Sequence, residues 1–161
     1  MLYEPLLHIV LYQPEIPPNT GNIGRTCVAT GAKLWLIEPL GFQIDEKQLR
    51  RAGLDYWPLL EWEAVPDWNA LVARLGPPLA GHRAWFFTKT AKRPYTEINF
   101  QKGDVLVFGS ESSGLPPEIL QQHSSQAIRV PMRPEVRSLN LSATVAVAAY
   151  EAVRQIQPPI S

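Results

Sequence analysis

The sequence predicts an α/β fold, with a mainly parallel sheet covered by helices on both faces. Segments with strand character alternate with segments of helix character along the whole chain, which is typical of this class. The strand-like segments are short continuous apolar runs rather than alternating ones, as in strands that are buried on both faces. No internal repeat or linker breaks the pattern, so residues 1–161 are expected to form a single domain.

The first half of the chain holds three expected strands and three expected helices. Apolar runs rich in Leu, Ile, Val and aromatic residues predict strands at residues 7–12, 34–37 and, in a less apolar form, 59–62. Segments that end at or near a glycine predict helices at residues 22–30, 45–53 and 66–76. The second of these helices opens on Asp45-Glu46-Lys47-Gln48, a pattern that resembles a capping box.

The second half continues the alternation. Strands are expected at residues 84–88, 105–108 and 128–130, and helices at residues 116–122 and 141–156. The shorter helix has proline in its first turn, where a missing N–H does no harm. Residues 139–149 are small and apolar almost all round, so the long helix must be buried on more than one side. The sheet can cover one side, and a second subunit is a plausible cover for the other.

Composition excludes several classes of protein. Fifteen basic residues balance fifteen acidic ones, which is unlike a generic nucleic-acid binder, so any RNA contact must come from local patches or from an oligomer. A single cysteine, Cys27, excludes an internal disulfide and a multi-cysteine metal site. No apolar run is long enough to span a membrane, and the N-terminus lacks the features of a signal peptide. We therefore expect a cytoplasmic protein with no metal.

Three unusual loops follow expected strands, at the end of the sheet where open parallel sheets bind ligands. They are PPNTGNIGRT (17–26), GSESSGLPPE (109–118) and PMRPEVRSLNLS (131–142). Each has a plain structural alternative: a turn and a helix cap, a glycine turn before a helix, and a helix cap, respectively.

The second loop has the GxxxxG spacing of a phosphate-binding loop, from Gly109 to Gly114, but Leu115 stands where that motif needs lysine. Glu111 lies inside the loop, and its carboxylate would repel a phosphate by a few kcal/mol at close range. A ligand that is cationic or rich in donors is therefore favoured. A GxSxG nucleophile elbow is not present either.

The first loop combines Asn19, Asn22 and Arg25 with an expected helix start near Asn22. The unpaired N–H groups and the positive end of the helix dipole, with these side chains, suit a ribose or a phosphate. The third loop carries Arg133, Arg137, Ser138, Asn140 and Ser142 just before the long helix. Asn140 or Ser142 is expected to cap that helix.

Together the three loops resemble the motifs of the SPOUT superfamily of RNA methyltransferases, in its 2′-O-ribose branch. NTGNIGRT looks like the first motif, LVFGSESSGLP like the second and IRVPMRPEVRSLNLSATVAVAAYE like the third. PEIPPNTGN and RRAGLDYW look most like the TrmL type, which methylates the wobble ribose, cytidine or uridine, of leucine tRNAs. The resemblance implies an α/β knot with a C-terminal trefoil knot, a homodimer with sites at its interface, S-adenosylmethionine as methyl donor and tRNA as substrate.

By resemblance, the cofactor belongs with the second and third motifs. Backbone groups at Phe87, Gly109 and Val130, with Ser138, match the family's cofactor positions, and Gly114 belongs to the same loop. An adenine slot would be walled by Phe87, Val130, Met132 and Leu139. Glu111 would face the sulfonium and amino group, or else hold Arg25 or the first loop in place.

By the same resemblance, the first motif belongs to the substrate and the chemistry. Arg25 and Asn22 are the implied catalytic residues. Because arginine is nearly always protonated, we expect Arg25 to orient the ribose or phosphate and stabilise the developing alkoxide, rather than to act as a base. The expected RNA-binding residues are Asn19, Asn22, Arg25, Arg129, Asn140 and Arg154. Some relatives have arginine where this chain has Ser113, so one RNA contact of the family is in question.

Two alternatives stay open at this point. The same chemistry could act on another tRNA position or on ribosomal RNA, or the dimer could bind RNA without turnover. The set Asn22, Arg25, Glu111, Ser138 and Asn140 argues against a pure binder, which needs no such combination.

Overall fold

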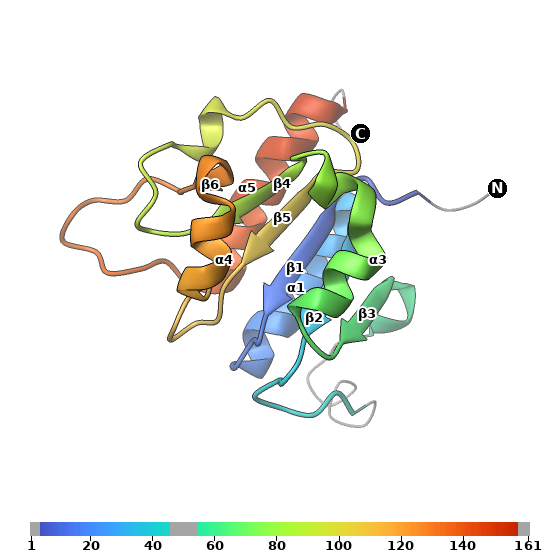
Figure 1. Ribbon diagram of the computed structural model, residues 1–161. Coiled ribbons are helices and arrows are strands. Elements are labelled where there is room, and N and C mark those ends of the chain that lie inside the picture. The colour runs from blue at the N-terminus through green and yellow to red at the C-terminus, as the bar shows by residue number, and fades with distance from the viewer. Residues whose placement is uncertain (1–3, 46–54, 158–161) are drawn as a thin grey trace.

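The computed structural model describes residues 4–45 and 55–157, and its strands form one parallel sheet. Within these residues the sheet has the strand order β3-β2-β1-β5-β4-β6 (Figure 1). The strands are β1 (His8–Tyr12), β2 (Lys33–Ile37), β3 (Trp62–Val65), β4 (Ala84–Phe87), β5 (Val105–Phe108) and β6 (Ala127–Ile128). The predicted α/β class with a mainly parallel sheet is therefore confirmed.

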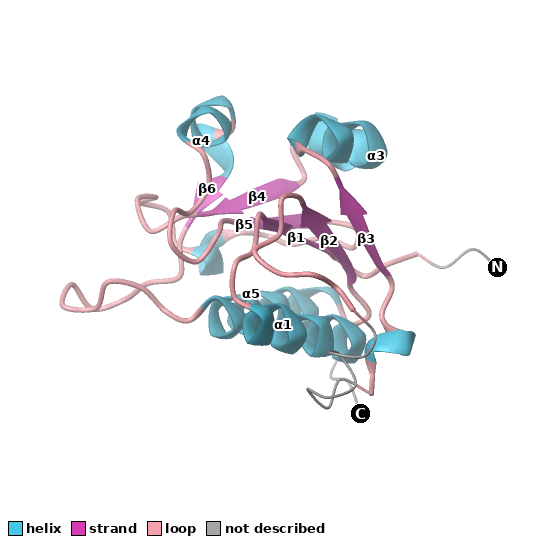
Figure 2. Ribbon diagram, turned by 90° about the horizontal axis from the view of Figure 1, so that it is seen from below, coloured by secondary structure: helices cyan, strands magenta, loops and turns pink. Residues whose placement is uncertain are grey.

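Helices cover both faces of the sheet, as predicted (Figure 2). One face carries α1 (Pro17–Thr30) and α5 (Leu141–Ile156), and the other carries α3 (Trp68–Ala80) and α4 (Pro117–Gln122). Three short 3-10 turns complete the described elements: η1 (Trp57–Leu59), η2 (Tyr95–Glu97) and η3 (Ser124–Gln126). Most of the helix expected at residues 45–53 lies outside the described residues.

The core is divided between the two faces because successive residues of a strand point to opposite sides. In β1, Ile9 and Leu11 pack into the cluster that contains residues of α1 and α5. Val10, between them, belongs to the other cluster, with residues of α3 and α4. All three are fully buried, which explains why this strand is a continuous apolar run in the sequence.

Helix α1 begins earlier than the predicted residue 22. Pro17 and Pro18 occupy its first positions, where the missing N–H groups have no helical partner to lose. The predicted start was wrong because a Pro-Pro pair is compatible with both a loop and a first helical turn. Asn19, Gly21 and Asn22 therefore lie in the first turns of the helix rather than in a turn before it.

Three other predicted boundaries were wrong. The strand expected at residues 59–62 is not formed: η1 ends at Leu59, and β3 begins only at Trp62. Trp57 and Leu60 are buried while Leu59 is exposed, which is a pattern of burial that fits a turn. Helix α3 continues through Pro77 and Pro78 to Ala80 instead of ending at Gly76. Strand β6 ends at Ile128, because Arg129 pairs with Pro94 rather than with β4. The C-terminal trefoil knot stays a prediction.

Candidate functional site

A cavity of about 590 Å³ opens at the carboxyl ends of β4, β5 and β6. Its lining includes every residue predicted for the cofactor: Phe87, Gly109, Glu111, Gly114, Val130, Met132, Ser138 and Leu139. It also includes some of the predicted RNA-binding residues: Asn19, Arg129 and Asn140. Segments that are far apart in the sequence thus meet in one cavity, at the end of the sheet where ligands were expected.

The glycines of the second loop are required by its own backbone. Residues Ser110 and Gly114 form an antiparallel bridge, closed by the Gly114 N–H donating to the Ser110 carbonyl at 3.0 Å. A Cβ on Gly109 would lie 2.2 Å from the Gly114 carbonyl carbon. Gly114 has φ +66°, in the left-handed region that favours glycine. The GxxxxG spacing therefore makes a tight hairpin, not a phosphate cradle.

Glu111 and Glu15 form a reciprocal clasp between this hairpin and the start of α1. Glu111 Oε1 accepts a hydrogen bond from the Glu15 N–H at 2.9 Å, and Oε2 accepts one from the Ile16 N–H at 2.7 Å. In return, Glu15 Oε1 accepts from Ser112, at 3.1 Å from its N–H and at 2.6 Å from its hydroxyl. These bonds from Ser112 lower the pKa of Glu15.

The clasp places the Glu111 carboxylate at the positive end of the α1 dipole, where a negative charge is stabilised. The carboxylate accepts hydrogen bonds from the backbone N–H groups of Glu15 and Ile16, directly before the first loop, which corresponds to the alternative role of holding that loop in place. Glu15 was missed by sequence reasoning. It lies before the recognisable motif, and its partner Ser112 is 97 positions away in the chain.

Asn19 joins all three motifs. Its Nδ2 donates to Glu111 Oε2 at 3.3 Å, and its Oδ1 accepts from Asn140 Nδ2 at 3.0 Å. Asn140 is the N-cap of α5, as predicted, and its Oδ1 accepts from the N–H groups of Ser142 and Ala143. Asn19 is only 6% exposed. Its amide is therefore a structural junction beneath the cavity, and it also reaches the lining.

The implied catalytic residues lie elsewhere on the subunit. Asn22 and Arg25 are exposed on α1, three positions apart and hence on one side of the helix. Neither lines the cavity. The structure thus brings together the residues predicted to bind the cofactor but leaves Asn22 and Arg25 outside the cavity that those residues line. Arg154 is also outside; it is exposed on α5 and pairs with Glu151 at 2.8 Å.

Tyr56 contacts Arg25, a role that the resemblance of RRAGLDYW, in which Tyr56 lies, did not indicate. The Arg25 guanidinium carbon lies 5.1 Å from the centroid of the Tyr56 ring, a cation–π arrangement. The Tyr56 hydroxyl donates to the Gly21 carbonyl, which fastens the ring to α1. Burial raises the pKa of Tyr56, with Arg25 acting in the opposite direction. Beside it, a side-chain atom of Trp57 lies 3.1 Å from where a Cβ on Gly24 would be. The glycine in NIGRT therefore leaves room for η1 to pack against α1.

Arg129 presents an unusual charged group at the cavity. Its backbone is fixed by the Arg93 carbonyl, at 3.0 Å from its N–H, and by the Tyr95 N–H, at 2.8 Å from its carbonyl. Its Nε is shielded from solvent and has no hydrogen-bond partner among the described residues. Such a donor costs free energy unless a ligand satisfies it. Arg129 also lines the cavity, so its guanidinium places a positive charge there.

The cavity suits S-adenosylmethionine. Val130, Met132 and Leu139 offer apolar surface for a planar ring, and the Phe87 ring behind them is stacked on Phe108 with centroids 4.5 Å apart. Backbone at Gly109 approaches without a side chain in the way. The positive charge of Arg129 at the lining suits the carboxylate of the cofactor. An apolar slot with a few polar groups is the usual form of a cofactor site.

Other chemistries find no support in the described residues. Within residues 4–45 and 55–157, no group of three or more His, Cys, Asp and Glu could hold a metal ion. Over the same ranges, no helix is long and apolar enough to cross a membrane. Cys27 is buried, and burial raises the pKa of its thiol to about 12. A thiolate nucleophile at this position is therefore disfavoured.

A family model for the SpoU rRNA Methylase family matches residues 6–150. The chain belongs to the SpoU methylase family. The fold described above is thus that of a SpoU methylase.

Among the relatives of this SpoU chain, a protein of Methylovorus glucosotrophus named tRNA (cytidine(34)-2′-O)-methyltransferase is 50% identical over 151 residues, covering 93% of this chain and 96% of the relative. A protein of Saccharophagus degradans with the same name is 46% identical over 155 residues, covering 94% and 96%.

Solved structures agree with the SpoU assignment. One, described as giving insights into the 2-OH methylation of C/U34 on tRNA, is 47% identical with a TM-score of 0.85, covering 92% of this chain and 95% of its own. The SpoU methyltransferase AviRb of Streptomyces viridochromogenes, in complex with AdoMet, has a TM-score of 0.80 at 23% identity, covering 96% of this chain and 59% of its own. This second likeness shows the shared fold alone.

Proposed function

We propose that the protein transfers the methyl group of S-adenosylmethionine to the ribose 2′-hydroxyl of the wobble nucleotide, position 34, of tRNA. The observation that carries this proposal is the identity of about half of the residues, over nearly the full length, with proteins named tRNA (cytidine(34)-2′-O)-methyltransferase. The cavity supports it independently, because its lining unites all the residues that the resemblance assigns to the cofactor. Cytidine or uridine in leucine tRNAs is the substrate implied by the resemblance.

The residues of this chain have two tasks in such a reaction. Bound S-adenosylmethionine would supply an electrophilic methyl group on a positively charged sulfur, which would keep the electron pair of the C–S bond when the ribose oxygen takes the methyl group. The 2′-hydroxyl is a poor nucleophile, so it must be held in line and lose its proton, which passes to solvent water. Arg25 stabilises the developing negative charge on that oxygen, and Asn22 orients the ribose. Their exposure on α1 leaves them accessible to RNA.

A homodimer resolves the separation between these residues and the cavity. In one subunit Asn22 and Arg25 do not line the cofactor cavity, so we place them beside the cavity of a second copy. The outer surface of α5 supports this arrangement, because Val147 and Tyr150 are 41% and 48% exposed. Such apolar surface on a helix is typical of a subunit interface. A cytoplasmic location follows from the proposed substrate.

The direct test is mass spectrometry of nuclease digests of tRNA, and separately of ribosomal RNA, incubated with the purified protein and S-adenosylmethionine. We expect one added 2′-O-methyl group, at position 34 of leucine tRNAs. A methyl group at another tRNA position, or methylation of ribosomal RNA only, would move the protein to the corresponding alternative. Binding of both RNA and cofactor without any transfer would favour the non-catalytic dimer.

A further inference from the structure

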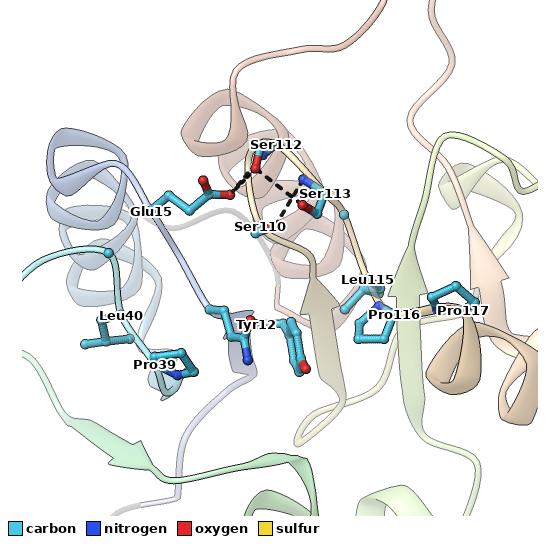
Figure 3. Close-up of a pocket in the computed structure, with 13 residues that line it drawn as sticks. Tyr12, Glu15, Pro39, Leu40, Ser110, Ser112, Ser113, Leu115, Pro116 and Pro117 are labelled. Atoms are coloured by element: carbon cyan, nitrogen blue, oxygen red, sulfur yellow. Dashed lines mark hydrogen bonds between the residues drawn. The ribbon is translucent and has the colours of Figure 1, made fainter.

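A second cavity of about 490 Å³ lies beside the first, at the carboxyl ends of β1, β2 and β5. Figure 3 shows Tyr12 between two walls, with Pro39 and Leu40 on one side and Leu115 and Pro116 on the other. The cavity is therefore a slot with an aromatic ring and flat apolar sides. None of the roles assigned so far uses it.

The hairpin of the second motif separates the two cavities. Ser110 and residues 112–115 line both of them. A ligand in the second cavity thus lies one hairpin away from the cofactor. When one part of a substrate approaches the cofactor, an adjacent part of the same substrate can reach the second cavity.

The wall of the second cavity that contains Gly41 is held against the segment that follows β1. The Gly41 N–H donates to the Pro14 carbonyl at 2.9 Å, and a Cβ on Gly41 would lie 2.8 Å from the Glu15 Cα. Gln13, which also lines the slot, has φ +49°. Non-glycine residues in this region are uncommon and cluster at functional sites.

The charge of the slot selects against phosphate. Among the described residues that line it, Glu15 is the one charged side chain, and no Lys or Arg takes part. Hydrogen bonds from Ser112 lower the pKa of Glu15, so it is ionised at neutral pH and accepts hydrogen bonds only. An occupant should be flat, uncharged and equipped with an N–H donor. A nucleobase with an exocyclic amino group has these properties, and aromatic rings stack on any base.

We propose that this second cavity binds one base of the RNA substrate, adjacent to the nucleotide that is methylated, and that this base carries an exocyclic amino group. Its ring stacks on Tyr12, its amino group donates to Glu15, and its phosphates stay outside. The inference rests on the proposed function, because it takes the anticodon loop of tRNA as the source of the base.

The test measures binding of anticodon stem-loop RNAs by fluorescence anisotropy, with each loop base removed in turn to give an abasic site. We expect one abasic RNA, lacking a base other than that of the methylated nucleotide, to bind the unmodified protein about tenfold more weakly than the complete loop does. A loss of affinity of about tenfold is typical when one stacked base is removed. Tyr12→Leu should bind the complete loop about tenfold more weakly and no longer distinguish that abasic RNA. Tyr12→Phe, the matched control, keeps the ring and should keep the discrimination.

Glu15→Gln tests the amino group separately. Its side chain is exposed, so the substitution is expected to fold, and the amide oxygen can still accept from Ser112. The base whose removal weakens binding is then replaced by an analogue with hydrogen or oxygen in place of its amino group. This replacement should weaken binding of the RNA to the unmodified protein but should not weaken its binding to Glu15→Gln. Calorimetric titration with S-adenosylmethionine checks that the cofactor cavity is intact in each variant.

The inference is overturned if Tyr12→Leu and Glu15→Gln both discriminate among the abasic RNAs as the unmodified protein does. It is also overturned if both variants bind every RNA, including the abasic one, more weakly by the same factor. Failure of the proposed function has a different signature. In that case no 2′-O-methyl group appears at position 34, whatever the abasic profile shows.

Discussion

The side chain of Asn140 donates a hydrogen bond to the side chain of Asn19 over 3.0 Å, joining residues 121 positions apart. Asn19 in turn donates a hydrogen bond to the carboxylate of Glu111. The start of α1, the hairpin after β5 and the cap of α5 are thereby held at one point. The predicted substrate residue Asn19 is thus also a support for the cofactor cavity.

Asn19→Ala should lower both stability and cofactor affinity. It removes the two hydrogen bonds that the largely buried Asn19 amide makes with Asn140 and Glu111, at a cost of about 1–3 kcal/mol in the free energy of unfolding. Chemical denaturation and calorimetric titration with S-adenosylmethionine measure the two effects. Asn22→Ala is the matched control, since Asn22 is exposed on the same helix, and its stability should change by less than about 0.5 kcal/mol. Equal stability of the two variants would contradict the role of Asn19.

Gly109→Ala should disrupt the hairpin that both cavities share. The added Cβ would lie 2.2 Å from backbone of Gly114, an atom that cannot move away as a flexible side chain would. We expect a fall in melting temperature and loss of measurable S-adenosylmethionine binding. Gly76→Ala is the control: nothing lies within 4 Å of its Cβ, in α3, and alanine should add about 0.5–1 kcal/mol of stability. A Gly109→Ala protein with unchanged binding would contradict the steric account.

Arg25→Ala should lose turnover without losing the cofactor. The guanidinium is outside the cofactor cavity, so S-adenosylmethionine affinity should stay within about twofold, while removal of a transition-state charge should lower kcat roughly a hundredfold or more. Arg25→Lys keeps the charge but not the planar fork, and should recover part of the rate. Single-turnover methylation of tRNA measures the rate. Weaker cofactor binding with an unchanged rate would instead assign Arg25 to the cofactor.

Stability should fall as the pH is lowered from about 6.5 toward 4, through His8. Burial, and then the charge of Lys33, lower the pKa of His8 from 6.5 to about 4, and His8 Nδ1 accepts from Trp35 Nε1 at 3.0 Å. The unfolded chain takes up the proton first. The stability that neutral His8 contributes is therefore complete above pH 6.5 and is lost progressively toward pH 4, by at most about 3 kcal/mol.

Urea denaturation across this range measures the effect, and His8→Gln is the control. Glutamine can accept from Trp35 without titrating, so the variant should lack the part of the slope that His8 causes. The carboxylates with lowered pKa, such as Glu63 and Glu151, are common to both proteins and cancel in the difference. Parallel pH profiles of the two proteins would rule out this explanation.

The sequence was most informative where one local cause determines the structure. The central strands were predictable because burial on both faces demands a continuous apolar run. The Asn140 cap was predictable because a cap is a contact within one turn. Two misses have the opposite origin: Glu15 and Tyr56 act on residues 97 and 35 positions away. Such pairs leave no periodic signal, and although the two residues lie in PEIPPNTGN and RRAGLDYW, the resemblance of those stretches assigned neither residue a role. The start of α1 was missed because a Pro-Pro pair is compatible with both a loop and a first helical turn.

The single cysteine of the chain gives the molecule an internal reporter. The thiol of Cys27 is fully buried in the cluster that α1 forms with α5. A thiol reagent can therefore reach it only when these helices separate, and the rate of labelling measures how often they do. Slower labelling upon addition of S-adenosylmethionine or tRNA would report, without any engineered probe, that the ligand holds this pair of helices closed.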